Sequence, residues 1–224
     1  LDPDMRSNLV KAVHDHKHTP DPSLPNALQR PVDWDWVFPL EKALPPYRSI
    51  GEIARERNIE EIEVFLNMAL EKDLKQFFVQ PSHNQDQNAV IEMIRHPKTA
   101  VTFSDAGAHV ATTINPIHGH LLGHWVRNEQ AIELEMAIRK ITFEIAKFWG
   151  LQNRGLLKKG ACADITIFNP KTITPGMPEL VHDLPAGAPR IKQKTDGIMA
   201  TIVNGKLFMS DNEHTGIFPV SYTH

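Results

Sequence analysis

The first part of the chain alternates between helical hydrophobic spacing and proline-rich breaks. Apolar residues recur at helical intervals over residues 2–18, and two such patterns follow one another over residues 49–73. Between them, residues 19–31 hold four prolines and predict a loop. Residues 33–40 predict a short strand that ends at the prolines beyond it. We therefore expect one helix near the start and two helices before residue 75.

The middle of the chain changes character. Residues 76–81 are a short apolar run stopped by a proline, residues 86–97 repeat apolar side chains at helical spacing, and residues 98–105 again favour a strand. A strand, a helix and a strand in about thirty residues predict a βαβ unit with parallel strands. Active sites of parallel α/β folds lie at the carboxyl ends of the strands. The second strand ends at Asp105, which places this residue at such an edge.

A long amphipathic helix is predicted over residues 132–150, and Gly150 suits its C-terminal cap. Seven apolar residues supply its expected buried face: Ile132, Met136, Ile138, Ile141, Ile145, Phe148 and Trp149. Past residue 151 the spacing becomes that of strands. Residues 163–170 alternate, and residues 197–209 hold two apolar runs around Asn204-Gly205, a pair that favours a two-residue hairpin. We expect a small antiparallel β element after the α/β part.

Composition and charge narrow the class. With 224 residues, 41% hydrophobic and 23% charged, the chain is typical of a soluble globular protein. A net charge of -3 offers no basic face for nucleic acid or an anionic membrane, and no apolar run approaches the ~18–20 residues that span a bilayer. The single cysteine, Cys162, excludes an internal disulfide and favours a small buried residue in a reducing, cytoplasmic setting. The chain begins without Met and without the apolar core of a signal peptide, so we expect a piece of something longer.

Asp105 is the first candidate for chemistry. A carboxylate at the edge of a core is costly unless it is paired, hydrogen-bonded or bound to a metal. Asp105 follows Ser104 and precedes Gly107, a pattern that also suits a turn or a helix cap. From the local pattern alone, a structural role and a chemical role are both open.

Two groups of histidines suggest metal binding at first inspection. Residues 14–18 place three histidines at alternate positions, but they end a helical pattern, which favours a solvated helix end. His120 and His124 are four residues apart and share a helix face. No H-E-x-x-H pattern accompanies them, so we favour a packed helix with Leu121, Trp125 and Val126 in the core. His109 is kept as a candidate for substrate contact.

Several motifs between about residues 80 and 216 together resemble a known family: HPKTAVTFSDAGAHV, HLLGHWVRN, NRGLLKKGACADITIFNP, VHDLPAGAPR and VNGKLF followed by DNEHTG. They resemble the C-terminal half of metal-dependent amidohydrolases, in particular the N-acyl-D-amino-acid deacylase (D-aminoacylase) branch. The resemblance implies an α/β fold, the C-terminal part of a (β/α)8 TIM-type barrel plus a small antiparallel β-sandwich element. Residues 1–75 would be a helical inserted segment before barrel strand seven, residues 76–150 the last two β/α units, and residues 151–224 the C-terminal part of the sandwich.

The resemblance also assigns roles. The acidic residue that ends strand eight matches Asp105, which would bind the metal, expected to be zinc, or its water, take the proton and pass it to the leaving nitrogen. Ser104 and His109 would contact the substrate. The other metal ligands of the family lie upstream of a segment like this one. We therefore expect no activity and no stoichiometric zinc from this chain alone, and either the missing N-terminal half of the barrel or self-association to complete it.

The expected function is hydrolysis of a non-peptide C–N bond by a metal-activated water, with a small-molecule amide such as an N-acyl amino acid as substrate. The family's deacylases follow the aspartate with an arginine-containing segment, whereas Arg127 is the first arginine after Asp105 here. Alternatives therefore remain: a cyclic amide such as a hydantoin, a carbamoyl compound, or a non-catalytic fragment that lacks the upstream ligands. We expect neither a nucleic acid nor a membrane as a partner.

Overall fold

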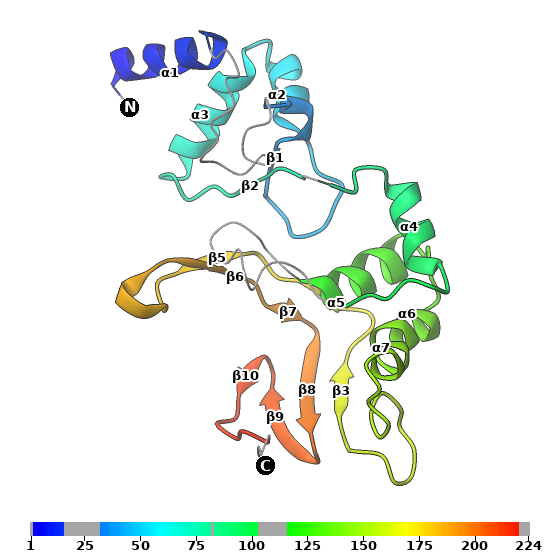
Figure 1. Ribbon diagram of the computed structural model, residues 1–224. Coiled ribbons are helices and arrows are strands. Elements are labelled where there is room, and N and C mark those ends of the chain that lie inside the picture. Colours follow the sequence, from blue (N-terminus) through cyan, green and yellow to red (C-terminus); the bar gives the residue numbers. More distant parts are fainter. Residues whose placement is uncertain (1, 16–31, 82, 103–115, 220–224) are drawn as a thin grey trace. The chain divides into compact units, whose positions relative to one another are not determined.

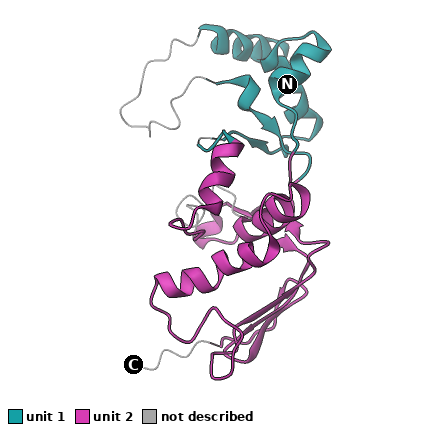
Figure 2. Cartoon of the chain, turned by 90° about the vertical axis from the view of Figure 1, so that its right-hand side faces the viewer, with its two compact units in different colours: residues 1–42, 46–86 teal, residues 43–45, 87–224 magenta. Residues whose placement is uncertain are grey.

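The structure is a computed structural model that describes most of the chain, namely residues 2–15, 32–81, 83–102 and 116–219 (Figure 1). It divides into two compact units (Figure 2). The first unit consists of residues 1–42 and 46–86, and the second unit consists of residues 43–45 and 87–224. The chain is a mixed α/β protein with small antiparallel sheets. No helix within the described ranges is long and apolar enough to cross a membrane.

The described residues of the first unit form three helices, a 3-10 turn and a two-stranded ribbon: α1 (Pro3–Asp15), α2 (Ile50–Arg57), α3 (Glu61–Glu71), the turn Trp34–Trp36, β1 (Phe38–Pro39) and β2 (Phe78–Val79). The helices lie where the hydrophobic spacing predicts them. Ser49 begins α2 with a capping box, because its hydroxyl accepts the Glu52 N–H at 3.0 Å and the Glu52 carboxylate accepts the Ser49 N–H at 2.8 Å.

The core of the first unit is apolar and combines residues of α2 and α3 with residues near β1 and β2. Its buried members are Val37, Ile50, Ile53, Ala54, Val64 and Met68, and Trp34, Phe65 and Phe78 pack against them. The rings of Phe65 and Phe78 lie 4.2 Å apart between centroids, which ties α3 to β2. Helix α1 buries no residue and is held to α3 by Arg6, which donates to Glu63 and to Asn67.

The predicted parallel βαβ unit is not present among the described residues. Strand β2 pairs antiparallel with β1, with Phe38 opposite Val79. Helix α4 (Gln87–Arg95) follows as predicted, but residues 98–102 form no strand, and the rest of that predicted strand lies outside the described residues. The nearby β1 offers β2 an antiparallel partner, a pairing that sequence spacing does not reveal.

The helices of the second unit are α4, α5 (Ile117–His120), a π-helix that continues it (Leu121–Asn128), α6 (Leu134–Ile141) and α7 (Phe143–Phe148). The single helix predicted over residues 132–150 is therefore wrong. It breaks at Thr142, where φ is -124° and ψ is -82°, and the Thr142 hydroxyl donates to the Ile138 carbonyl at 2.7 Å.

The break changes which side chains are buried. Ala146 is the buried residue of α7, whereas Phe148 is 68% exposed and Trp149 61% exposed, contrary to the predicted apolar face. Before the break, Ile132 is buried as predicted, but Met136 of α6 is exposed. The predicted cap at Gly150 is confirmed. Gly150 has φ of 71°, its N–H bonds the Lys147 carbonyl, and the Leu151 N–H bonds the Ala146 carbonyl at 2.8 Å.

The strands of the second unit form one sheet of order β10-β9-β8-β3 and two ribbons, β4–β7 and β5–β6. Their bounds are β3 (Ile165–Phe168), β4 (Thr174–Pro175), β5 (Glu179–Val181), β6 (Arg190–Lys192), β7 (Thr195–Asp196), β8 (Ile198–Val203), β9 (Lys206–Ser210) and β10 (Glu213–His214). All pairs are antiparallel. The predicted hairpin is confirmed: Asn204 and Gly205 have φ of 49° and 75°, as a type I′ turn requires.

The core of the second unit lies around the π-helix: Leu121, Leu122, Trp125, Ile132, Ala137 and Ile173 are its buried members. Two glycines let this helix approach the β4–β7 ribbon. A Cβ on Gly119 would lie 2.7 Å from Thr195 Cγ2, and one on Gly123 would lie 2.8 Å from the Ile173 carbonyl oxygen. The helix packs closely on the ribbon because neither position carries a side chain.

Candidate functional site

The residues predicted to carry the chemistry, Ser104, Asp105 and His109, lie outside the described residues. The structure describes the chain before them, up to residue 102, and after them, from residue 116. Val101 packs against the core cluster of the second unit, and Leu121 and Leu122 belong to that same cluster. The chain therefore leaves one hydrophobic core before Asp105 and returns to it afterwards.

The histidines after this segment lie on α5 and the π-helix. The rings of His120 and His124 are 4.9 Å apart between centroids, and the His124 ring lies 4.7 Å from that of Trp125. His124 is 6% exposed, and within the described part of the chain its Nδ1 has no hydrogen-bond partner. The Glu129 carboxylate oxygen Oε1 lies 3.8 Å from this nitrogen, which is too long for a hydrogen bond.

Burial controls the charge of these histidines. Burial, together with the nearby charge of His124, lowers the pKa of His120 to about 4. It also lowers the pKa of His118 and of His124; for His124 the Glu129 carboxylate acts in the opposite direction. All three imidazoles are therefore expected to be neutral at neutral pH. Neutral imidazoles can accept a proton or bind a metal, but buried ones do so only if a ligand or solvent reaches them.

The described residues do not by themselves fit a catalytic zinc ion. Such sites use about three protein ligands, and no group of three His, Cys, Asp or Glu side chains that could hold a metal occurs in the described ranges.

The predicted packing of the helix that carries His120 and His124 is confirmed, since Leu121 is 3% exposed and Trp125 7% exposed. Val126 is partly buried beside them. His14, the first histidine of the 14–18 group, is exposed and bonds Glu60 at 2.9 Å.

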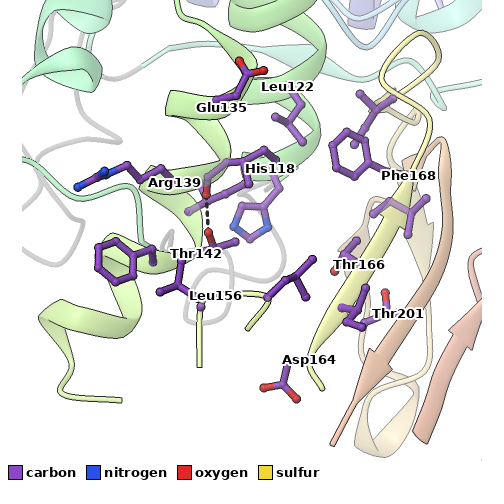
Figure 3. Close-up of a pocket in the computed structure, with 18 residues that line it drawn as sticks. His118, Leu122, Glu135, Arg139, Thr142, Leu156, Asp164, Thr166, Phe168 and Thr201 are labelled. Carbon is purple, nitrogen blue, oxygen red and sulfur yellow. Dashed lines mark hydrogen bonds between the residues drawn. The ribbon is translucent and has the colours of Figure 1, made fainter. Parts of the chain in front are cut away.

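A cavity of about 860 Å³ opens between α6, α7 and strands β3 and β8 (Figure 3). Its walls are mostly apolar, including Leu122, Ile138 and Phe168, and the His118 ring projects into it. Two of its charged residues are engaged elsewhere: Arg139 Nε donates to Glu144 at 3.0 Å, and the Asp164 carboxylate accepts from Arg154. These walls suit an apolar group rather than proton transfer.

One feature of this unit escaped the sequence patterns. Lys140 is 1% exposed, although a lysine in a helix is ordinarily assigned to the solvent face. The available signal was its spacing of three from Ala137, which is fully buried. Cys162 is unpaired and only partly buried, so the expectation of a buried cysteine holds in part.

Comparisons with known proteins agree on one family. A family model described as "Amidohydrolase family" matches residues 37–208. An uncharacterized protein of Mycobacterium tuberculosis (strain H37Rv) is 25% identical over 187 residues, which are 78% of this chain and 30% of that protein. The N-acyl-D-aspartate deacylase of Alcaligenes xylosoxydans xylosoxydans is 36% identical over 97 residues, 43% of this chain and 18% of that enzyme.

Solved structures give a distant likeness. A D-aminoacylase structure concerned with a binuclear metal centre has a TM-score of 0.46 and 25% identity, and the match covers 79% of this chain and 35% of that one. The N-acyl-D-glutamate deacylase of Bordetella bronchiseptica, complexed with zinc and a phosphonate inhibitor, has a TM-score of 0.43 and 21% identity, covering 77% and 34%. The chain thus spans about a third of the length of these relatives.

Proposed function

The chain belongs to the amidohydrolase family, and from that premise we propose that it is the C-terminal part of a zinc-dependent enzyme that hydrolyses a non-peptide C–N bond. The observation that carries this proposal is the family match over residues 37–208, which includes the SDAGAHV segment. The intact enzyme would be a (β/α)8 barrel with a small β-sandwich. The antiparallel sheet that lies wholly after residue 151 is consistent with the sandwich part.

The proposed substrate is an N-acyl amino acid or a related small amide. The 36% identity to an N-acyl-D-aspartate deacylase over 97 residues supports this class. The absence of arginine between Asp105 and Arg127 supports the alternative of a cyclic amide or a carbamoyl compound, because no guanidinium from that stretch is available to bind a substrate carboxylate. The cytoplasmic location, the partner that completes the barrel and the three-part division of the chain stay predictions.

Asp105 would carry the proton transfers. As general base it takes a proton from the water whose oxygen bonds the amide carbon, and as general acid it gives that proton to the nitrogen as the C–N bond breaks. Ser104 and His109, its neighbours in sequence, would contact the substrate. Zinc would supply a bound water with a pKa near ~7, and its ligands besides Asp105 are expected, from the family resemblance, in the part of the enzyme upstream of this segment.

The experiment is a kinetic comparison in the full-length protein. Asp105→Asn should lower kcat by at least ~100-fold with the circular dichroism spectrum and melting temperature retained. Asp183→Asn is the matched control, because that aspartate is half-exposed and accepts two hydrogen bonds from Arg190 on an exposed ribbon. Substrates are N-acyl-amino acids, a hydantoin and an N-carbamoyl amino acid, assayed with zinc added.

Two results would contradict the proposal. If Asp105→Asn loses its fold and has no separate effect on turnover, the residue is a structural cap. If the full-length protein with zinc hydrolyses none of the three substrate types, the chain belongs to a non-catalytic member of the family.

A further inference from the structure

Lys140 is a buried charge that the proposed mechanism does not use. It lies in α6 and is 1% exposed. Its ammonium donates to the carbonyl oxygens of His96 at 2.9 Å and Thr99 at 3.1 Å, and Glu144 Oε2 lies 3.7 Å away. Removing an ammonium from water is costly unless its donors are satisfied. The two carbonyls satisfy two of the three N–H donors, and the carboxylate lies within ion-pair distance of the charge.

The two carbonyls belong to the turn that follows α4. Within this turn the Thr99 N–H bonds the His96 carbonyl at 3.2 Å, and the Thr99 hydroxyl donates to the carbonyls of His96 and Met93. Lys140 thus reaches from a helix more than 40 positions away to close a turn that is already bonded to itself. The next residues in sequence run directly to Asp105.

The same stretch also packs on the hydrophobic core to which α6 contributes. Val101 packs against the core cluster to which α6 contributes Ala137, with Ile138 and Ile141 beside it. Asp105 is four positions after Val101, so full extension allows at most ~14 Å between their Cα atoms. Asp105 therefore lies within this distance of a residue that the core holds.

We propose that Lys140 is a positioning residue for Asp105, fixing the turn from which the catalytic segment departs. This role rests on the proposed function, because it presumes that Asp105 acts on the substrate. A methionine has nearly the same length and would fill the same space, but it offers no N–H to the two carbonyls. The lysine therefore specifies where residues 96–99 lie, in addition to filling the core.

The kinetic test uses the full-length enzyme with Lys140→Met, Lys140→Arg and, as control, Lys147→Met, which changes an exposed lysine of α7. We expect Lys140→Met to lower kcat about tenfold or more per folded molecule while KM and zinc content stay within about twofold, since small misplacements of reacting groups cost rate. Lys140→Arg should recover part of the loss, and Lys147→Met should match the parent. A lowered melting temperature with unchanged kcat in Lys140→Met would overturn the proposal, leaving Lys140 a stabilising residue only.

If Lys140→Met does not fold, Lys140→Arg decides. In that variant, faster hydrogen exchange at residues 98–102 together with a lowered kcat at unchanged KM supports positioning, whereas faster exchange with a parental kcat overturns it.

A second measurement separates this proposal from the function itself. Hydrogen exchange in Lys140→Met should be at least about tenfold faster at the amides of residues 98–102 and unchanged in the β8–β9 hairpin. Parental exchange at residues 98–102 would overturn the fixing of this turn by Lys140, even if the full-length protein shows no amidase activity and the proposed function has failed. Faster exchange with parental kcat would overturn the positioning of Asp105.

Discussion

Asp164 connects the β8–β9 hairpin to the start of β3, and its replacement by alanine should loosen that hairpin. One carboxylate oxygen accepts the Asn204 N–H at 2.8 Å, and the other accepts from Arg154. Arg154 also donates to the Asn204 side-chain oxygen at 2.9 Å. Asp164→Ala removes the acceptor at the centre of this network and leaves the turn with the bond from the Gly205 N–H to the Ala163 carbonyl at 2.9 Å.

The expected magnitude follows from the lost bonds. A hydrogen bond to a charged group contributes ~1.5–3 kcal/mol when well shielded. The Asp164 side chain is 27% exposed, so solvent screening reduces the value, and we expect a loss of about 1–2 kcal/mol in local stability. At tenfold per 1.4 kcal/mol, this corresponds to about 5- to 30-fold faster hydrogen exchange at the hairpin amides.

The assay is hydrogen exchange at the amides of residues 198–210 in parent and variant, followed by mass spectrometry. Asp183→Ala is the matched control. Asp183 also binds an arginine, with bonds of 2.6 and 2.7 Å to Arg190, but that pair joins residues seven apart on one exposed ribbon. We expect it to leave the β8–β9 hairpin unchanged. Equal effects of the two variants, or no change in Asp164→Ala, would refute the network as the source of hairpin stability.

The remaining predictions concern pH, packing and metal. Burial raises the pKa of Asp164, but the hydrogen bonds from Asn204 and Arg154 outweigh burial and hold this pKa below its ordinary value. Protection of the hairpin amides from exchange should therefore be complete at pH values above the ordinary pKa of aspartate, and it should be lost as the pH falls through the lowered pKa of Asp164. The pKa of His120, about 4 against an ordinary 6.5, means that the unfolded chain binds this proton more readily, so stability should fall between pH 6.5 and 4; a ring NMR signal titrating near 6.5 would contradict this. Gly123→Ala should destabilise the protein by ~1–3 kcal/mol, because its Cβ would lie 2.8 Å from the Ile173 carbonyl oxygen, and an unchanged melting temperature would show that the helix can shift. Metal analysis of this chain alone, after dialysis against a mild chelator, should give no stoichiometric zinc, whereas about one retained ion per chain would show that its own histidines build a site.

Sequence patterns predicted the elements whose determinants are local. Ser49 and Glu52 complete the capping box of α2 within four residues, and Asn204-Gly205 supplies the positive φ angles of its turn without help from the rest of the fold. The family was likewise readable from linear motifs, and the match over residues 37–208 confirms it.

Tertiary contacts decided what local patterns could not. Thr142 breaks the predicted helix, and its hydroxyl bonds back to Ile138, so Phe148 and Trp149 lie outside the face that the spacing assigned to the core. Among the described residues, strand β2 pairs antiparallel with β1, about 40 residues earlier in the chain, and not in parallel with the strand predicted over residues 98–105. Lys140 can be buried because its ammonium donates hydrogen bonds to the carbonyl oxygens of His96 and Thr99, in the turn that follows α4. Hydrophobic spacing indicates which residues prefer water. The hydrogen-bond acceptors that allow a charge to be buried are distant in sequence, and they reach that charge only once the fold has formed.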